Sequence, residues 1–127
     1  MGTCVDLRQL SGGRYRLGWD PAYDPRKVPR DKRDPWMMTI PCRDGCVIFP
    51  FGGGTLAVEC GRRRRRALRK LGLKVHQDGD DGATFLFDAA DFERVAEVAG
   101  ARRRRRYGPE QLARLRAQAA KARAAIR

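Results

Sequence analysis

Apolar and β-forming residues cluster in three neighbouring stretches in the middle of the chain. Short apolar runs bounded by turn residues are typical of β-strands, and they predict strands over 36–42, 46–51 and 55–60. Turns are predicted at 43–45 and 52–54, where Arg-Asp-Gly and three consecutive glycines interrupt the apolar positions. The three segments therefore predict part of an antiparallel sheet.

The N-terminal region also contains β-forming residues, clustered on both sides of a Ser-Gly-Gly sequence at 11–13. Segments 3–9 and 14–19 are therefore predicted to pair as a β-hairpin. Residues 20–35 contain three Asp-Pro pairs and a fourth proline. Because proline has no backbone N–H and restricts the residue before it, we predict a loop here rather than a helix or a central strand.

The spacing of apolar residues becomes helical after Gly61. A short helix is predicted there, with Ala67, Leu68 and Leu71 on its inward face. Arg64 lies beside these apolar residues, so its guanidinium must reach past them to a polar environment.

A hairpin and a second helix follow. Segments 73–77 and 83–87 are predicted to pair across a turn rich in Asp and Gly. Asp88 is the predicted N-cap of a helix over 89–99, and Gly100 is expected to end that helix. Together with the strand and helix before them, these elements form most of a split β-α-β unit.

A final helix is predicted from Pro109, because proline is favoured at the first helical position. Its apolar positions follow a four-and-three spacing, which makes a narrow seam of the kind found in coiled coils. The seam consists of Leu112, Leu115, Ala119, Ala122 and Ile126. An isolated helix with mainly like charges is marginal in water, so we expect this helix to project from the domain and to be ordered by a partner.

These elements together predict the fold class and the domain organisation. We expect an α+β fold, with an antiparallel β-sheet of about five to seven strands, two packed helices and a projecting basic C-terminal helix. Residues 1–100 are predicted to form the small α+β domain, including the Pro/Asp/Arg-rich loop at 20–35. Residues 101–127 are predicted to form a basic arm and an amphipathic C-terminal helix.

Charge is distributed very unevenly along this chain of 127 residues, whose formal net charge is +13. Residues 1–60 contain nine Lys or Arg and seven Asp or Glu, whereas residues 61–127 contain nineteen and eight. Two runs of five consecutive arginines, Arg62–Arg66 and Arg102–Arg106, stand out in the second half. Arginines this dense repel each other unless an anion or solvent screens them, and nucleic acid is the commonest polyanion.

We therefore predict a non-enzymatic nucleic-acid-binding protein, with DNA and RNA both open as the partner. The predicted phosphate contacts are Arg62, Arg65, Arg66, Arg69, Arg102, Arg103, Arg104, Arg105, Arg106, Arg114, Arg116, Lys121 and Arg123. Tyr107 is the predicted base-stacking residue because it adjoins the second arginine run. No signature of a known recognition module is present, so the sequence does not support sequence-specific recognition.

Aromatic residues near the Pro-rich loop are further stacking candidates. They are Tyr15, Trp19, Tyr23 and Trp36. The alternative for Trp19 and Trp36 is packing in the core, because large aromatic side chains dominate small cores.

The four cysteines raise the question of a metal site. Cys42 and Cys46 flank a glycine-containing turn, and the others are Cys4 and Cys60. Four thiolates can form a tetrahedral zinc site, but a Cys-x3-Cys spacing differs from the Cys-x2-Cys of a zinc knuckle. We expect no cofactor and keep zinc at these four cysteines as the alternative; buried free thiols and a Cys42–Cys46 disulfide are the other interpretations.

Two other functions remain open. One is a protein-interaction module whose basic C-terminal helix docks on an acidic partner or dimerises through its apolar seam. The other is a small metal-dependent nuclease or mobile-element accessory factor, based on Asp78, Asp80 and Asp81 in one turn.

Two further features narrow the choice. His76 is the only histidine, which excludes hydrolases and nucleases that need two. The sequence shows no long apolar segment and no signal-like N-terminus, so we expect a cytoplasmic protein without a membrane partner, associated with the nucleoid or ribonucleoprotein, or nuclear if eukaryotic.

Overall fold

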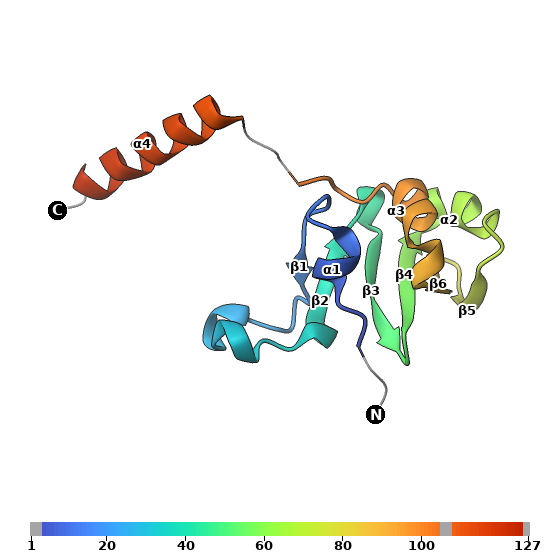
Figure 1. The fold of residues 1–127 in the computed structure, drawn as a ribbon. Helices are drawn as coiled ribbons and strands as arrows, with labels where there is room; N and C mark the ends of the chain where they lie inside the picture. Colours follow the sequence, from blue (N-terminus) through green and yellow to red (C-terminus); the bar gives the residue numbers. More distant parts are fainter. Residues whose placement is uncertain (1–3, 105–107, 126–127) are drawn as a thin grey trace.

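The sheet at the centre of the molecule is antiparallel, as predicted (Figure 1). The structure is a computed structural model, which describes residues 4–104 and 108–125. Six strands lie in the order β1-β2-β3-β4-β6-β5. Their bounds are β1 Gly18–Trp19, β2 Met38–Pro41, β3 Val47–Gly52, β4 Thr55–Gly61, β5 Lys74–Asp78 and β6 Gly82–Asp88. The α-helices are α1 Leu7–Ser11, α2 Arg62–Arg69, α3 Phe92–Ala99 and α4 Pro109–Ala125. The predicted α+β fold class is confirmed.

Strands β4 and β6 lie inside the sheet, between β3 and β5, and both contribute to the core. They pair antiparallel over their full lengths, with Val58 opposite Phe85, and both side chains are fully buried. Strand β5 pairs antiparallel with the other edge of β6, so β4 and β5 run parallel with β6 between them. This arrangement is the predicted split β-α-β unit.

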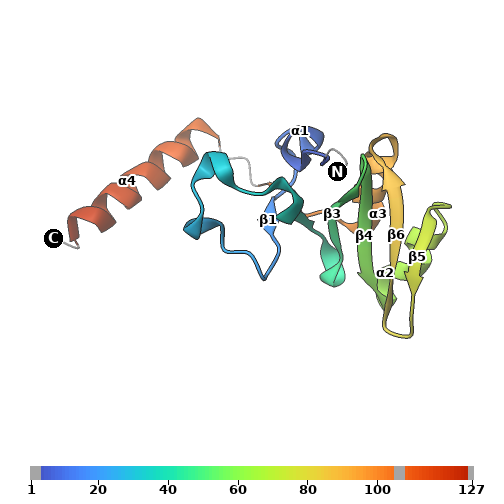
Figure 2. The ribbon, with the colours of Figure 1, turned by 90° about the horizontal axis from the view of Figure 1, so that it is seen from below.

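Helices α2 and α3 lie on the same side of β4 and β6 (Figure 2). Leu68 of α2 and Phe92 and Val95 of α3 are buried against the strands. Ala67, which the helical spacing placed on the inward face, is exposed, so that part of the prediction is wrong. Val75 on β5 is likewise 47% exposed, because β5 is the edge strand.

The predicted N-terminal hairpin is wrong. Residues Leu7–Ser11 form the short helix α1, and only Gly18–Trp19 joins the sheet, beside β2. The side chain of Asp6 accepts a hydrogen bond from the backbone N–H of Arg8 at 2.9 Å, and Gly12 ends the helix with a left-handed φ of 58°. An Asp N-cap and a Gly C-terminus are strong local helix signals, and here they outweigh the β-forming residues.

The loop at 20–35 contains neither an α-helix nor a strand, as predicted, but it has local order. It carries 3-10 turns, among them Pro25–Lys27 and, at its end, Pro35–Met37. In both turns the preceding aspartate, Asp24 or Asp34, caps the turn through its carboxylate. Each Asp-Pro pair here therefore supplies a cap followed by a residue with helical φ.

The start of α3 also differs from the prediction. Ala89–Asp91 form a 3-10 turn, α3 begins at Phe92, and the Asp88 side chain makes no capping hydrogen bond. Gly100 ends the helix with a φ of 74°, as predicted.

Helix α4 extends away from the sheet (Figure 1), and all its described residues are exposed. Leu112 and Leu115, which begin the predicted apolar seam, are 40% and 42% exposed. Ala119 and Ala122 are exposed as well, and Ile126 lies outside the described residues.

Candidate nucleic-acid interface

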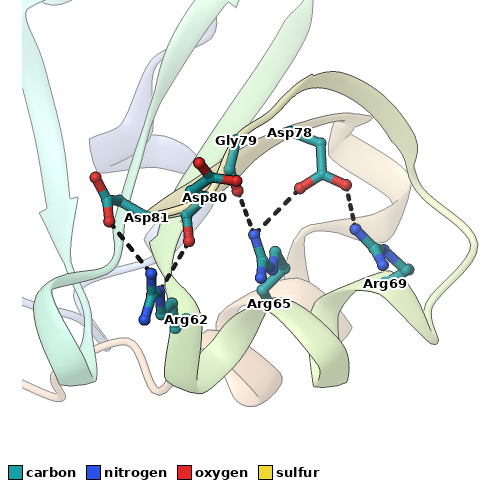
Figure 3. Close-up of polar contacts among 7 residues, drawn as sticks. All are labelled: Arg62, Arg65, Arg69, Asp78, Gly79, Asp80 and Asp81. Carbon is teal, nitrogen blue, oxygen red and sulfur yellow. Dashed lines mark hydrogen bonds and ion pairs between the residues drawn. The ribbon is translucent and has the colours of Figure 1, made fainter.

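The first arginine run faces an acidic turn of the same chain rather than open solvent (Figure 3). The turn joins β5 to β6 and lies over one face of α2. Arg62 Nε donates a hydrogen bond to the carbonyl oxygen of Asp80 at 2.8 Å, and Arg62 Nη2 is 3.6 Å from Asp81 Oδ1. The first guanidinium of the run is therefore engaged by the turn.

Two more arginines, one and two helical turns further along α2, make similar contacts. Arg65 Nη1 lies 3.3 Å from Asp78 Oδ1 and also donates to the carbonyl oxygen of Gly79. Arg69 pairs with the second oxygen of the same Asp78 carboxylate. The spacing 62, 65, 69 places these side chains on one helix face, and the turn supplies acceptors along that face.

These contacts change how the predicted phosphate contacts on α2 are understood. Arg62, Arg65 and Arg69 do share one face, but carboxylates and carbonyl oxygens already occupy several of their N–H groups. Arg66 is exposed, and it has no ion pair within residues 4–104 and 108–125. A phosphate would have to compete with the turn for Arg62, Arg65 and Arg69.

Arg64 lies beside the core, as predicted, and reaches two polar acceptors. Its side chain is 28% exposed; Nε donates to Asp44 Oδ2 at 2.9 Å and Nη1 donates to the carbonyl oxygen of Val98 at 3.1 Å. Asp44 has a left-handed backbone, with φ 56°, and it also lies 3.6 Å from Arg63. The hydrogen bond from Arg64 is the main cause that lowers the pKa of Asp44 below its ordinary value.

The second arginine run begins as part of the folded domain. Arg102 N donates to the carbonyl oxygen of Pro41 at 3.0 Å, and the Arg102 carbonyl accepts from Arg16 N at 2.7 Å. Arg104 N donates to the carbonyl oxygen of Arg14 at 2.9 Å. The segment therefore lies between two others as an added strand-like piece. The predicted basic arm is therefore attached to the domain by backbone hydrogen bonds at residues 102–104, while Arg105, Arg106 and Tyr107 lie outside the described residues.

This added segment forms one wall of an open groove of about 1340 Å³, with α3 on the other side. Eight arginines line the groove, against two glutamates, Glu93 and Glu97. The sequence pattern singled out four of these arginines, Arg64 and Arg102–Arg104, and only three of them as phosphate contacts. The tertiary structure thus gathers arginines from five separate parts of the sequence in one groove.

Most of the arginines in the groove have no carboxylate partner. Arg14 pairs with Glu93, and Arg94 lies 2.8 Å from Asp91. Within the part of the chain that the structure describes, no ion pair is found for Arg16, Arg43 or Arg102–Arg104, and all five are exposed. Their charges are therefore open to an external anion.

Sequence reasoning missed Arg14, Arg16 and Arg43 as binding residues. Each stands outside the two runs, at a distance of more than fifty residues from the second run. The tertiary structure brings them to it through the backbone hydrogen bonds of the added segment. The one available signal was the Arg-Tyr-Arg sequence at 14–16. Because Tyr15 is buried against Phe92, an extended backbone directs the two flanking arginines outwards.

The basic residues predicted on the C-terminal helix are all on α4 and exposed. They are Arg114, Arg116, Lys121 and Arg123. Among the other aromatic candidates, Trp36 is 37% exposed, whereas Tyr15 belongs to the core. Trp19 stacks at a tilt on Tyr23, with ring centroids 5.5 Å apart.

The cysteines are free thiols in a largely apolar setting. Cys42, Cys46 and Cys60 are buried and Cys4 is half-buried. Burial is the main cause that raises the pKa of Cys42 to about 12 and that of Cys46 to about 11. No group of three or more His, Cys, Asp or Glu side chains that could hold a metal ion is found in residues 4–104 and 108–125. Zinc binding at the cysteines stays an untested alternative, and it would require the deprotonation of thiols that the fold keeps neutral.

The acidic turn is the only basis for the nuclease alternative. Asp78 and Asp81 face guanidinium groups, so a divalent cation there would have to displace Arg62, Arg65 and Arg69. Positive charges at this distance oppose cation binding.

Comparisons with other proteins give no functional information. No protein-family model, no curated protein and no solved structure matches this chain. Among the described residues, no helix is both long enough and apolar enough to cross a membrane.

Proposed function

We propose that this protein is a non-enzymatic nucleic-acid-binding protein, and that its main phosphate contacts lie in the groove beside the second arginine run. One observation carries the proposal: eight arginines line the groove against two glutamates, and five of the eight have no ion pair among the described residues. The positive charges of such a surface repel one another. Binding of a polyanion is favourable because it screens this repulsion and releases the counterions condensed on the polyanion.

Helix α4 adds a second basic element to this proposal. Its exposed Arg114, Arg116, Lys121 and Arg123 have no acidic neighbour on the helix beyond Glu110. These side chains contact phosphates without reading bases, so they add affinity and salt dependence and little sequence preference.

The test is the salt dependence of binding to a fluorescently labelled oligonucleotide, measured by anisotropy between about 50 and about 200 mM NaCl. Single-stranded and duplex forms of the same sequence are compared. Each phosphate contact contributes about 0.9 to the slope of log K against log salt for duplex DNA, so replacing Arg102, Arg103 and Arg104 with Gln should reduce the slope by about 2.7. Affinity that does not change with salt would refute the proposal.

A matched control removes the same charge elsewhere. Arg26, Arg30 and Lys32 lie in the loop at 20–35 and are exposed. Their triple replacement with Gln lowers the net charge equally, so a simple net-charge effect would reduce affinity to the same extent as the groove variant. A contact in the groove would leave the slope of this control close to that of the wild type.

A second candidate function is supported by α4 alone. Leu112 and Leu115 are exposed on a helix that packs on nothing in the described domain, which suits docking on a partner. Replacing both with Asp separates the two candidates. A nucleic-acid-binding protein loses little affinity beyond the effect of two negative charges, whereas an interaction module loses self-association or partner binding, measured by light scattering and pull-down.

A further inference from the structure

Three arginines from distant parts of the sequence line the same groove. Arg43 comes from the turn after β2, Arg64 from α2 and Arg102 from the segment after α3, and all three line the groove. Arg43 and Arg64 both favour the ionised form of Asp44. Arg64 and Arg102 both favour the ionised form of Cys42, although burial still raises the pKa of that thiol to about 12. Their charges therefore act on neighbouring groups of the same turn.

Arg64 is held in place before any ligand binds. Its bonds to Asp44 and to the carbonyl oxygen of Val98 use two N–H groups, and its side chain is only 28% exposed. A guanidinium has five N–H donors, so three remain for a ligand. A side chain that is already ordered loses little conformational entropy on binding.

Arg43 is positioned by a different contact. Its aliphatic stem lies directly over the backbone of Gly100: a Cβ placed on Gly100 would come within 2.9 Å of Arg43 Cγ. Arg43 N also donates to the Gly100 carbonyl oxygen at 2.9 Å. Only glycine leaves space for the stem there and also accepts the φ of 74°.

Arg102 has an exposed side chain on a hydrogen-bonded backbone. Its N–H and its carbonyl oxygen are both hydrogen bonded, to Pro41 and to Arg16. Among residues 4–104 and 108–125, Asp44 is the one carboxylate found in an ion pair with any of these three arginines, and it pairs with Arg64, and with Arg63 beside it, but not with Arg43 or Arg102. The neutral thiol of Cys42 adds no negative charge, so the three arginines retain a net positive charge.

We propose that Arg43, Arg64 and Arg102 form a preformed phosphate site that fixes the position of one phosphate of the bound nucleic acid. The proposal rests on the proposed function and adds a fixed anchor to it. The remaining arginines of the groove and of α4 then contact the strand on either side without fixing its position. A tetrahedral oxyanion with several acceptor oxygens suits guanidinium groups that arrive from three directions.

The first experiment uses inorganic phosphate as the probe. Nitrogen-15 spectra of the arginine Nε–H groups are recorded during titration with sodium phosphate, and with sodium chloride at equal ionic strength. Saturable shifts of Arg43, Arg64 and Arg102 with phosphate but not with chloride are expected. Identical responses to the two salts would overturn the site.

The critical variant is Arg64→Lys, which keeps the charge but cannot donate to Asp44 and Val98 in the same geometry. Arg63→Lys is its matched control, because Arg63 is the adjacent residue, also contacts Asp44 at 3.6 Å and does not line the groove. We expect Arg64→Lys to abolish the saturable phosphate shifts and to weaken oligonucleotide binding about tenfold, with Arg63→Lys close to wild type. Equal behaviour of the two variants overturns the site.

Arg102→Lys is a second variant, needed in case Arg64→Lys fails to fold. It should fold normally, because the Arg102 side chain is exposed and its backbone hydrogen bonds are retained. It too should lose the phosphate shifts, and wild-type shifts in this variant would count against the site. The site and the function fail separately. Phosphate shifts without oligonucleotide binding support the site and refute the function. Oligonucleotide binding that is equal in Arg64→Lys and Arg63→Lys supports the function and refutes the site.

Discussion

Replacing Asp78 with Asn tests whether the acidic turn holds α2 in place. The Asp78 carboxylate contacts two arginines of α2, with Oδ1 3.3 Å from Arg65 and Oδ2 paired with Arg69. Asparagine has nearly the same shape but no charge, so the variant removes both ion pairs and leaves the backbone of the turn unchanged. The bond from Arg65 to the Gly79 carbonyl is retained.

The expected loss of stability follows from the exposure of the groups. The Asp78 side chain is 38% exposed, and Arg65 and Arg69 are 27% and 53% exposed, so solvent screens both pairs. Partly exposed pairs contribute about 0.2 to 1 kcal/mol each, which gives about 1 kcal/mol for the two together. In a domain of this size, a loss of about 1 kcal/mol lowers the Tm by about 4–8 °C.

The measurement is thermal unfolding followed by circular dichroism, in low salt and in about 1 M NaCl, where charges are screened within about 3 Å. The Tm difference between wild type and Asp78→Asn should shrink at high salt. Asp81→Asn is the control, since the Asp81 side chain is fully exposed and 3.6 Å from Arg62, and its Tm should equal that of the wild type. A loss that is unaffected by salt, or equal losses in the two variants, would refute the electrostatic explanation.

Three other predictions concern the core. Gly82→Ala places a Cβ 2.2 Å from the Cys60 carbonyl oxygen on the neighbouring strand, so we expect a loss of more than about 2 kcal/mol in urea unfolding, whereas Gly79→Ala meets its nearest atom at 3.8 Å and should be close to neutral. Leu68→Ala removes a fully buried side chain under α2, and the same measurement should show a loss of about 2–5 kcal/mol; a smaller loss would mean that α2 packs loosely. The fold raises the pKa of Cys42 from about 9 to about 12, so the stability that this thiol contributes is complete below about pH 9 and is lost as the pH rises towards 12. The free energy of unfolding, measured between about pH 9 and about pH 12, should therefore fall less steeply with pH in Cys42→Ala than in the wild type. Equal dependence on pH in the two proteins would contradict the burial of this thiol.

Most of the sheet was predictable because its strands carry a local signal. Ile48, Val58 and Phe85 lie in short runs of apolar and β-forming residues, and each is fully buried. The order β4-β6-β5 followed from the same argument, since a short helix between two strands and a hairpin after it favour a split β-α-β unit.

The N-terminal region was not predictable by alternation, because a helix of five residues is too short to show a clear period. Its decisive signals were Asp6 and Gly12 at the two ends. The added segment at 101–104 gave no sequence signal either. It consists of one alanine and three arginines directly after a helix, and such a composition is typical of a linker. Its partners, 14–16 and 41–43, are set by the fold.

The sequence alone determined the net charge, the position of both arginine runs, and the helix that begins with the first run. Only the tertiary structure decided which arginines have partners. Coulomb attraction and hydrogen bonds between partly exposed groups act over a few ångströms, so the charge state of a surface depends on which residues the fold brings together. The turn at 78–81 meets the first run, while residues 14–16 and 41–43 pair with the second run by backbone bonds alone. The two runs have the same sequence, yet the first is largely neutralised and the second leaves Arg102, Arg103 and Arg104 open to a partner.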